Sequence, residues 1–552
     1  MQHTNASQLK LTRAPSVSVH TLLCAFSFLA GLAALNQSSL ITGSEPWFNT
    51  FAGIELLAIL LFSAATTALI ERTIIHPYIF LQGTLALFIG GRFLASPLLD
   101  APIFTDNNYI PMELSYSESS HLMSFVCGAL LMMHAGYLLI RTLGEKAHIT
   151  FPKDRAQRGL FIPSLALLLV SATISIYAIT QHYAACIDRG YMAIYQDQGT
   201  DNLLRLSSIG QYGLLLGAGL AFATSKRWLQ ILAVSLVTGY YVAYLGVGLR
   251  SGFLALVLMA TWLAHTRLKR LNILTLIFVP LVMFGLAQLS TTVGCRASGG
   301  AAPKKESPTI TLEESNPSSA APKKESPAIT FEESNPPFAA ASNEAFFNSS
   351  NTETENFAVA PETKHTVSSL QRFKENLKLE QLAWFSYLQG STLVYTGAAM
   401  RIDEYPASAY LQTFFPGYSQ IAHILHPEIA SSDFYFPHYL ARSYSEEKYE
   451  QGFGMGWSIF SDLAAFSKGN AFLYALFSLV LGAALAYFIK GIESSAYLYG
   501  ALVCVFMKLM LLPRSGLYSV IPYLAVYTAI FLGWKLFMHL LHLLRKNRNL
   551  TT

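Results

Sequence analysis

The feature that most constrains this chain is a series of apolar runs, each close to the roughly 20 residues that a helix needs to cross a bilayer. Inside a membrane the backbone must satisfy its own hydrogen bonds, so each run is expected to be a helix. Twelve runs can be counted, and they are Val17–Leu35, Phe51–Ile70, Pro77–Ala95, Ser120–Ile140, Leu160–Thr180, Leu206–Thr224, Trp228–Val247, Gly252–His265, Ile273–Leu289, Ala471–Ile489, Ala496–Leu512 and Leu517–Leu541. The sequence therefore predicts an all-α polytopic integral membrane protein with about 12 transmembrane helices.

The composition supports a membrane protein and excludes several other classes. Hydrophobic residues make up 52% of the chain and charged residues only 13%, against about 25% charged residues in a typical soluble domain. The formal net charge is only +4, so nucleic acid is not expected as a partner. The five cysteines form no CxxC pair, which argues against a zinc module and against a disulfide scaffold.

The charges between the runs predict the orientation of the chain in the membrane. With a cytoplasmic N-terminus, the inside segments carry Lys10, Arg13, Arg72, Arg141, Lys146, Lys153, Arg155, Arg158, Lys226, Arg227, Arg267, Lys269, Arg270, Lys490, Arg545, Lys546 and Arg548. The short outside segments carry the acidic residues Glu45, Asp100, Asp106, Glu113, Asp188, Asp197 and Asp201. This distribution follows the positive-inside rule at every short loop. Both termini are therefore expected in the cytoplasm, and the one long polar loop on the outer side.

The long loop divides the chain into four predicted regions. Residues 1–289 hold nine transmembrane helices, 290–366 an insert, 367–469 a structured outer loop, and 470–552 the last three helices. The insert contains a tandem repeat, because the segment Ala301–Pro317 recurs at Ala320–Pro336 with two substitutions. Its Ala-, Pro-, Ser- and Glu-rich composition cannot bury enough apolar surface to fold, so disorder is expected there.

Several arginines interrupt the inside bias, because they fall on the predicted outer side. They are Arg92, Arg189, Arg205, Arg250, Arg401, Arg442 and Arg514. Each could pair with a carboxylate or a lipid headgroup, since interfacial arginine is common. Arg250 and Arg514 are the stronger functional candidates, because each lies in a short Gly- and Ser-containing turn between two spans.

Clustered outer guanidinium groups indicate a phosphate or pyrophosphate ligand. The planar fork of arginine matches two phosphate oxygens and keeps its charge at all relevant pH values. A fixed cation can also stabilise a leaving pyrophosphate without a metal ion. The chain has no Asp-x-Asp pair and no Walker A motif, which disfavours chemistry on cytoplasmic sugar nucleotides or ATP. No cofactor is expected.

A sugar hydroxyl acceptor would need a general base, and the outer loop offers several candidates. They are Asp403, Glu404, His438, Glu446 and Asp462, of which His438 is favoured because it lies among aromatic residues and near Arg442. Each could equally be an ordinary solvated or hydrogen-bonded loop residue. His423 and His426 could supply two metal ligands but no third is evident, so no metal site is predicted. The loop aromatics could stack on sugars or form a membrane-interface belt.

The overall plan resembles bacterial Wzy-type O-antigen polymerases and the related O-antigen ligases. The resemblance lies in the turn Gly248–Gly252, in the large late loop that ends at Asn470, and in the Gly-x-Gly-x-Gly-x-Ser stretch Gly452–Ser458. The segment Gly190–Tyr195 after the fifth span is also similar. The similarity covers most of the chain but skips the repeat insert.

This resemblance implies a GT-C-like membrane glycosyltransferase of the bacterial inner membrane with a periplasmic loop. It would polymerise oligosaccharide repeat units linked to undecaprenyl pyrophosphate, embedded in the lipid bilayer beside a candidate flippase and chain-length regulator. Under this hypothesis Arg250 and Arg514 hold the donor pyrophosphate. Arg189, Arg401 or Arg442 would assist, or would hold the acceptor pyrophosphate.

Three other functions are compatible with the sequence. An O-antigen ligase would have a similar build but would pass the glycan to lipid A–core. A transporter or flippase of lipid-linked glycan is an alternative of another class, although the chain lacks the repeated halves common in transporters. A non-catalytic assembly factor is the third. Cys186 and Cys295 both fall on the predicted outer side, where a disulfide between them could form.

Overall fold

The computed structural model describes residues 17–36, 45–106, 110–146, 158–189, 201–224, 226–247, 251–267, 379–426, 428–450, 452–492 and 494–551. Nearly all ordered elements in these ranges are helices. The membrane-type helices are α1 (Val17–Asn36), α2 (Glu45–Glu71), α3 (Pro77–Phe88), α4 (Gly91–Leu99), α5 (Tyr116–Lys146), α6 (Phe161–Arg189), α8 (Asp201–Phe222), α9 (Arg227–Val247), α10 (Ser251–Arg267), α20 (Ala471–Gly491), α21 (Ala496–Met510) and α22 (Ile521–Thr551).

The predicted membrane character is confirmed in its main features. Among the described residues, eight helices are long and apolar enough to cross a membrane. Three shorter apolar helices, Leu206–Phe222, Ser251–Thr266 and Ala496–Met510, coincide with further predicted runs. The predicted run Ile273–Leu289, the predicted disordered insert 290–366 and residues 367–378 of the loop lie outside the described residues. The chain is therefore an all-α polytopic membrane protein.

The third predicted run is not one continuous helix. It divides at Ile89 and Gly90 into α3 and α4. A Cβ atom on Gly91 would come within 2.3 Å of the carbonyl oxygen of Ser386, so the start of α4 lies directly against the backbone of α13 (Leu379–Gln389). Only glycine permits this approach, and it turns Arg92 into the protein interior.

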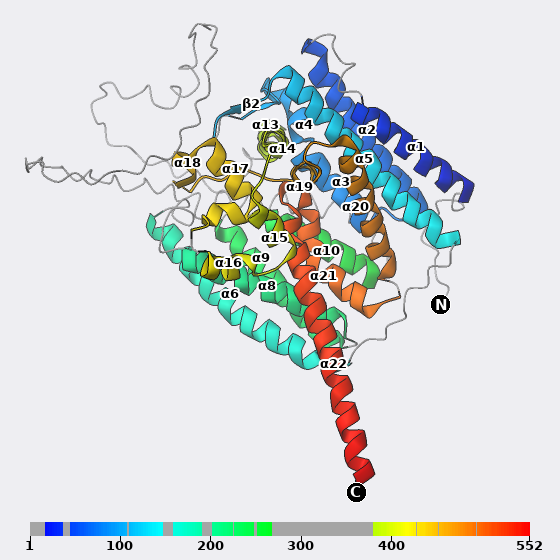
Figure 1. Cartoon of the computed structure of the whole chain (residues 1–552), viewed down its shortest axis with the longest axis vertical. Coiled ribbons are helices and arrows are strands. Elements are labelled where there is room, and N and C mark those ends of the chain that lie inside the picture. Colours follow the sequence, from blue (N-terminus) through cyan, green and yellow to red (C-terminus); the bar gives the residue numbers. More distant parts are fainter. Residues whose placement is uncertain are drawn as a thin grey trace, which may run out of the picture.

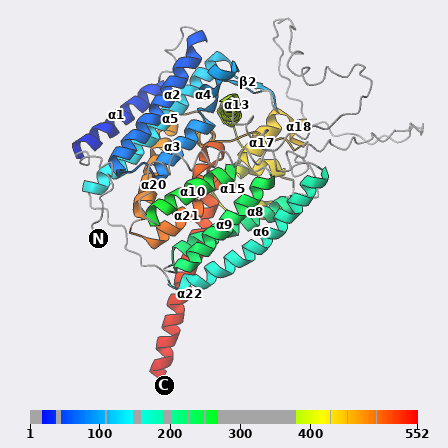
Figure 2. The same cartoon turned by 180° about the vertical axis from the view of Figure 1, so that it is seen from behind.

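Two groups of membrane helices flank a central layer. In Figure 1, α1, α2, α5 and α20 lie on one side and α6, α8 and α9 on the other, with α10 and α21 between them; the reverse view in Figure 2 agrees. The crossing of α5 and α20 depends on small residues. A Cβ atom on Gly136 would lie 2.0 Å from the carbonyl oxygen of Leu479, and one on Gly482 only 1.8 Å from that of Met133. Such close backbone contact is typical of packed membrane helices.

The long polar loop forms a compact set of short helices near one end of this bundle (Figure 1). Its elements are α13, α14 (Thr392–Met400), α15 (Ala407–Phe414), α16 (Tyr418–Leu425), η5 (Ser431–Phe434), α17 (Phe436–Tyr444), α18 (Glu446–Glu450) and α19 (Ile459–Ser467), beside the short antiparallel strands β1 (Thr105–Asp106) and β2 (Met112–Glu113). Tyr405, Phe436 and Trp457 are buried and pack on one another. These aromatics therefore form the core of the loop, which is neither of the roles the sequence suggested for them.

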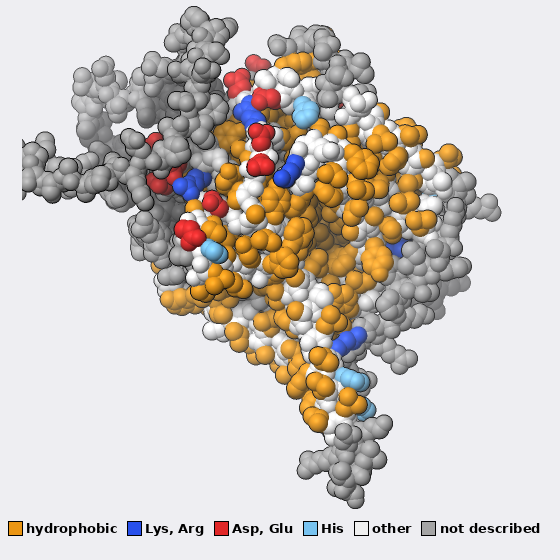
Figure 3. Space-filling view, viewed as in Figure 1, with side chains coloured by type: hydrophobic (Ala, Val, Ile, Leu, Met, Phe, Trp, Pro, Cys, Tyr) orange, Lys and Arg blue, Asp and Glu red, His pale blue; other side chains and the backbone are white. Residues whose placement is uncertain are grey.

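Charged and apolar side chains occupy different parts of the surface. On the face shown in Figure 3, acidic and basic side chains gather near β2, α17 and α18, while hydrophobic side chains cover most of the remaining described surface. Large apolar side chains are exposed along the membrane-type helices, including Leu61 at 70% and Ile231 at 67%. Such extensive apolar exposure is compatible with a lipid environment rather than with water.

Candidate functional site

One short turn joins the last two membrane-type helices and carries the predicted Arg514. It consists of the 3-10 turns η6 (Leu512–Arg514) and η7 (Leu517–Ser519), and we call residues 512–519 the arginine turn. The Arg514 side chain is exposed, and its Nη1 donates a hydrogen bond to Oε1 of Gln389 at 2.7 Å. Its guanidinium carbon lies 5.9 Å from the ring centre of Phe88. A loop helix and two membrane-type segments thus converge on one accessible cation.

A buried carboxylate lies directly beneath the arginine turn. Asp462 is fully buried in α19, where its Oδ1 accepts a 2.7 Å hydrogen bond from Nε1 of Trp457 and its Oδ2 accepts one from the backbone N–H of Leu517. A Cβ atom on Gly516 would lie 2.6 Å from Oδ2. The turn can therefore approach the carboxylate only because position 516 is glycine. Asp462 thus connects α19 by a hydrogen bond to the arginine turn, which carries Arg514.

Burial decides the protonation of Asp462. Removal from water raises the pKa of this carboxyl to about 7, although the hydrogen bonds from Leu517 and Trp457 act in the opposite direction. A buried charge is costly, and neither donor carries a compensating positive charge. The group consequently changes protonation near neutral pH. Because its side chain is fully enclosed, Asp462 holds the turn in place and does not face a substrate directly.

The Gly452–Ser458 stretch positions this carboxylate. Ser458 begins α19 as its N-cap, accepting a hydrogen bond from the backbone N–H of Ser461, and its hydroxyl lies 2.7 Å from that of Thr396 on α14. A Cβ atom on Gly456 would lie 2.7 Å from the ring of Tyr395. The glycine-rich segment thus packs closely on α14 and starts α19 one turn before Asp462. This stretch is one of those on which the family resemblance rests.

Aromatic side chains connect His438 to the arginine turn. Its ring packs edge-on against Tyr435, whose ring in turn lies 6.4 Å from that of Tyr518 in the arginine turn. Nδ1 of His438 is 3.2 Å from the hydroxyl of Tyr449. The side chain keeps an exposed portion, but partial desolvation by these rings lowers its pKa. His438 is therefore an accessible, mainly neutral imidazole at neutral pH.

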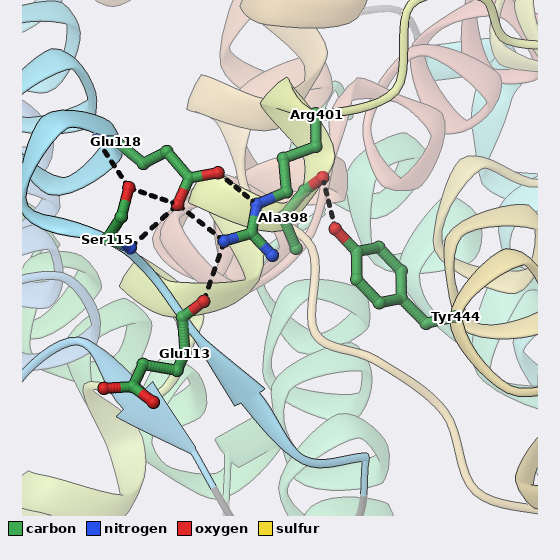
Figure 4. A network of polar contacts seen from close by, with 6 residues as sticks. All are labelled: Glu113, Ser115, Glu118, Ala398, Arg401 and Tyr444. Atoms are coloured by element: carbon green, nitrogen blue, oxygen red, sulfur yellow. Dashed lines mark hydrogen bonds and ion pairs between the residues drawn. The ribbon is translucent and has the colours of Figure 1, made fainter. Parts of the chain in front are cut away.

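Arg401 forms an ion pair that joins the loop to a membrane-type helix (Figure 4). Its Nε and Nη2 donate to the two carboxylate oxygens of Glu118, at 2.6 and 2.7 Å, and Nη2 also donates to the carbonyl oxygen of Glu113. Glu118 lies in the first turn of α5. In the same view, the hydroxyl of Tyr444 donates to the carbonyl oxygen of Ala398 at 3.3 Å. This bidentate pair fastens α14 to α5 near β2.

Arg442 and the remaining acidic candidates lie on exposed parts of the loop. Arg442 forms an i,i+4 pair with Glu446 at 2.7 Å, and both side chains are well exposed. Asp403 and Glu404 lie in the turn between α14 and α15, and Glu404 approaches Lys468 at 3.8 Å. The structure brings Arg442 onto the same short helix as His438. It leaves Asp403 and Glu404 solvated.

Two predicted arginines cannot be placed at the site. Arg250 lies outside the described residues, as does the side chain of Arg189, whose backbone ends α6. Cys186 is disulfide-bonded, and its expected partner Cys295 lies outside the described residues. Among described residues, no group of three or more His, Cys, Asp or Glu side chains is arranged to hold a metal ion.

Sequence reasoning missed Gln389 and Trp457, which contact Arg514 and Asp462 respectively. Neither residue type signals a site on its own, and the contacts arise only when the loop folds onto the last two spans. The only available signal was the position of Trp457 directly after the glycine-rich stretch.

Comparison of the chain with protein-family models, with curated proteins and with solved structures finds no match.

Proposed function

We propose that the protein polymerises oligosaccharide repeat units linked to undecaprenyl pyrophosphate, at the outer face of a bacterial inner membrane. The observation that supports this most is the accessible guanidinium of Arg514 at the junction of the loop and the last two spans. A lipid-linked diphosphate has its charged group at the membrane surface and its chain in the bilayer. A cation at the boundary between polar loop and apolar helices suits such a molecule.

In the proposed reaction the acceptor hydroxyl oxygen attacks the anomeric carbon of the donor glycan. The bond between that carbon and the pyrophosphate oxygen breaks, and the bonding electrons leave with undecaprenyl pyrophosphate. The negative charge that develops on the leaving oxygen is stabilised by Arg514, which needs no metal for this purpose. Arg250 is a further candidate to hold the donor pyrophosphate, and Arg189, Arg401 or Arg442 are candidates to assist or to hold the acceptor pyrophosphate.

The proton of the acceptor hydroxyl passes to His438. Its lowered pKa leaves the imidazole neutral and able to accept a proton near neutral pH. Tyr449, beside Nδ1, orients the ring. Asp462 acts as a positioning residue, since it holds the backbone of Leu517 and leaves room only for glycine at position 516.

The test is a comparison of surface glycan from cells that carry the gene, lack it, or carry it with a substitution. Deletion should remove the ladder of long chains and leave lipid A–core capped with a single repeat unit. Loss of all capped lipid A would instead identify the ligase or flippase alternative. An unchanged ladder would exclude a role in this assembly altogether.

The residue-level test uses His438→Gln with Arg227→Gln as a control on the opposite, predicted cytoplasmic side. Removal of a general base typically slows a reaction roughly 100- to 10,000-fold, so His438→Gln should shorten or abolish the ladder. The control should retain it at equal membrane abundance. A normal ladder in the His438 variant would remove that residue from the mechanism without affecting the proposal for Arg514.

A further inference from the structure

A polar cavity lies away from the arginine turn. It has a volume of about 470 Å³, and its polar lining includes Glu71, His76, Arg141, His265 and Lys490. These residues come from the end of α2, the start of α3, and the ends of α5, α10 and α20. Four separate stretches of the chain thus contribute to one site that the proposed reaction does not use.

Two helices place this cavity at the opposite end of the bundle from the arginine turn. The first, α3, begins directly after His76, which lines the cavity, and ends at Phe88, which lies beside Arg514. The second, α20, begins after α19 and reaches the cavity with Lys490. A 21-residue helix is about 32 Å long, close to the thickness of the hydrocarbon core. The cavity therefore lies at the level of the other membrane surface.

The lining favours an anion. The lining has the basic residues Arg141 and Lys490, one acidic residue, Glu71, and two histidines. Nη2 of Arg141 donates to Glu71 at 2.6 Å, whereas its Nε is buried and has no hydrogen-bond partner among the described residues. The hydroxyl of Tyr137 also donates to Glu71, at 2.7 Å. Glu71 thus accepts from two side chains, and the basic side chains of the lining outnumber its acidic one.

We propose that this cavity binds a phosphate group, and that its source is the headgroup of an anionic phospholipid. A phosphate would accept from Arg141 and Lys490 while an acyl chain followed the exposed apolar helices into the bilayer. Basic pockets between membrane helices at this depth suit phospholipid headgroups. The apolar side chains of Trp262 and Ile489 also line this cavity.

The test is native mass spectrometry of the purified full-length protein in detergent, titrated with phosphatidylglycerol or phosphatidylcholine. Phosphatidylglycerol should bind more tightly. Lys490→Gln should weaken its binding by about fivefold, the value expected for one basic residue near a membrane surface. Glu71→Gln should strengthen it, because that substitution removes the only negative charge in the lining. The matched control is Arg227→Gln, an exposed basic residue at the start of α9 outside the cavity, which should leave binding unchanged.

The tightening in Glu71→Gln is decisive, since misfolding cannot produce it. Equal binding of both lipids together with no gain in Glu71→Gln would overturn the proposal. Competition with inorganic phosphate distinguishes a lipid headgroup from free phosphate as the ligand. If it displaces phosphatidylglycerol at low millimolar concentration with the same dependence on Lys490 and Glu71, the phosphate site stands but the lipid source is wrong.

Discussion

Arg92 and Arg514 both lie where the long polar loop meets a membrane-type helix, yet their surroundings are opposite. Arg92 is fully buried, donates to Asp106 at 3.0 Å and to the carbonyl oxygen of Ile103, and lies over the ring of Tyr387. Arg514 is exposed, donates to the neutral amide of Gln389 and lies over the ring of Phe88. Because Arg92 is enclosed, its role is structural. Because Arg514 is accessible, a ligand can reach it.

The two carboxylates differ in the same way. Asp106 is buried against a guanidinium, while buried Asp462 accepts from an indole and a backbone amide, and its pKa is raised to about 7. Burial without a cationic partner favours the protonated form of Asp462 near neutral pH. The comparison predicts that changes near Arg92 alter stability and that changes near Arg514 alter activity.

The largest expected effect is the loss of stability on breaking the Arg92 pair. Asp106→Ala leaves a buried guanidinium without its carboxylate, which typically costs about 3–5 kcal/mol. Thermal unfolding of the purified protein in detergent should show a much lower midpoint or no folded protein. The exposed pair supplies the control, because Glu446→Ala should change stability by less than about 0.5 kcal/mol. Equal effects of the two substitutions would contradict the distinction.

The next effect is on activity at the arginine turn. Arg514→Ala should reduce polymerisation roughly 100- to 1,000-fold, the usual consequence of removing one preorganised donor to a developing negative charge. Its thermal midpoint should stay close to that of the parent protein, because the side chain is exposed. Arg514→Lys should recover part of the activity, since lysine keeps the charge but not the planar fork. A variant that loses stability and activity together would place Arg514 in the same class as Arg92.

A smaller effect is the pH dependence of stability that Asp462 contributes. Its pKa rises from 3.8 to about 7 on folding, so the folded state keeps a proton that the unfolded state releases. The free energy of unfolding should therefore fall as pH rises from about 4 to 7 and then level off, by about 2 kcal/mol between pH 5 and 7. Asp462→Asn should remove most of this slope, and Asp403→Asn, on an exposed turn, should retain it. A parent protein whose stability is flat over this range would show that Asp462 stays ionised.

The smallest effects are expected for the exposed pairs. Arg401→Ala breaks a half-exposed bidentate pair and should cost about 1 kcal/mol, and Arg442→Ala should cost about 0.3–0.5 kcal/mol. Chain-length profiles of both variants separate a structural role from a role in acceptor binding. A large loss of long chains at nearly unchanged stability in either variant would widen the proposed site to include that arginine.

The sequence predicted the membrane helices well because apolar runs of this length have few other stable conformations. It did not predict the division of the third run, since that depends on the contact between Gly91 and the backbone of Ser386, nearly 300 residues later. It also identified Arg514 as special from its turn. It could not predict the ion pair of Arg401 with Glu118, because that contact forms only after α14 packs near α5. Asp462 could be proposed as a base, but its burial depends on tertiary contacts with Trp457 and Leu517.

The central claim is that the accessible guanidinium of Arg514 binds a lipid-linked diphosphate. The most direct measurement is the binding of undecaprenyl pyrophosphate to the purified full-length protein, compared among the parent, Arg514→Ala and Arg442→Ala proteins. The account predicts a loss of affinity of at least about tenfold in the Arg514 variant, as for one charge-assisted bidentate contact, and little change in the Arg442 variant. Equal affinity in all three proteins would contradict it.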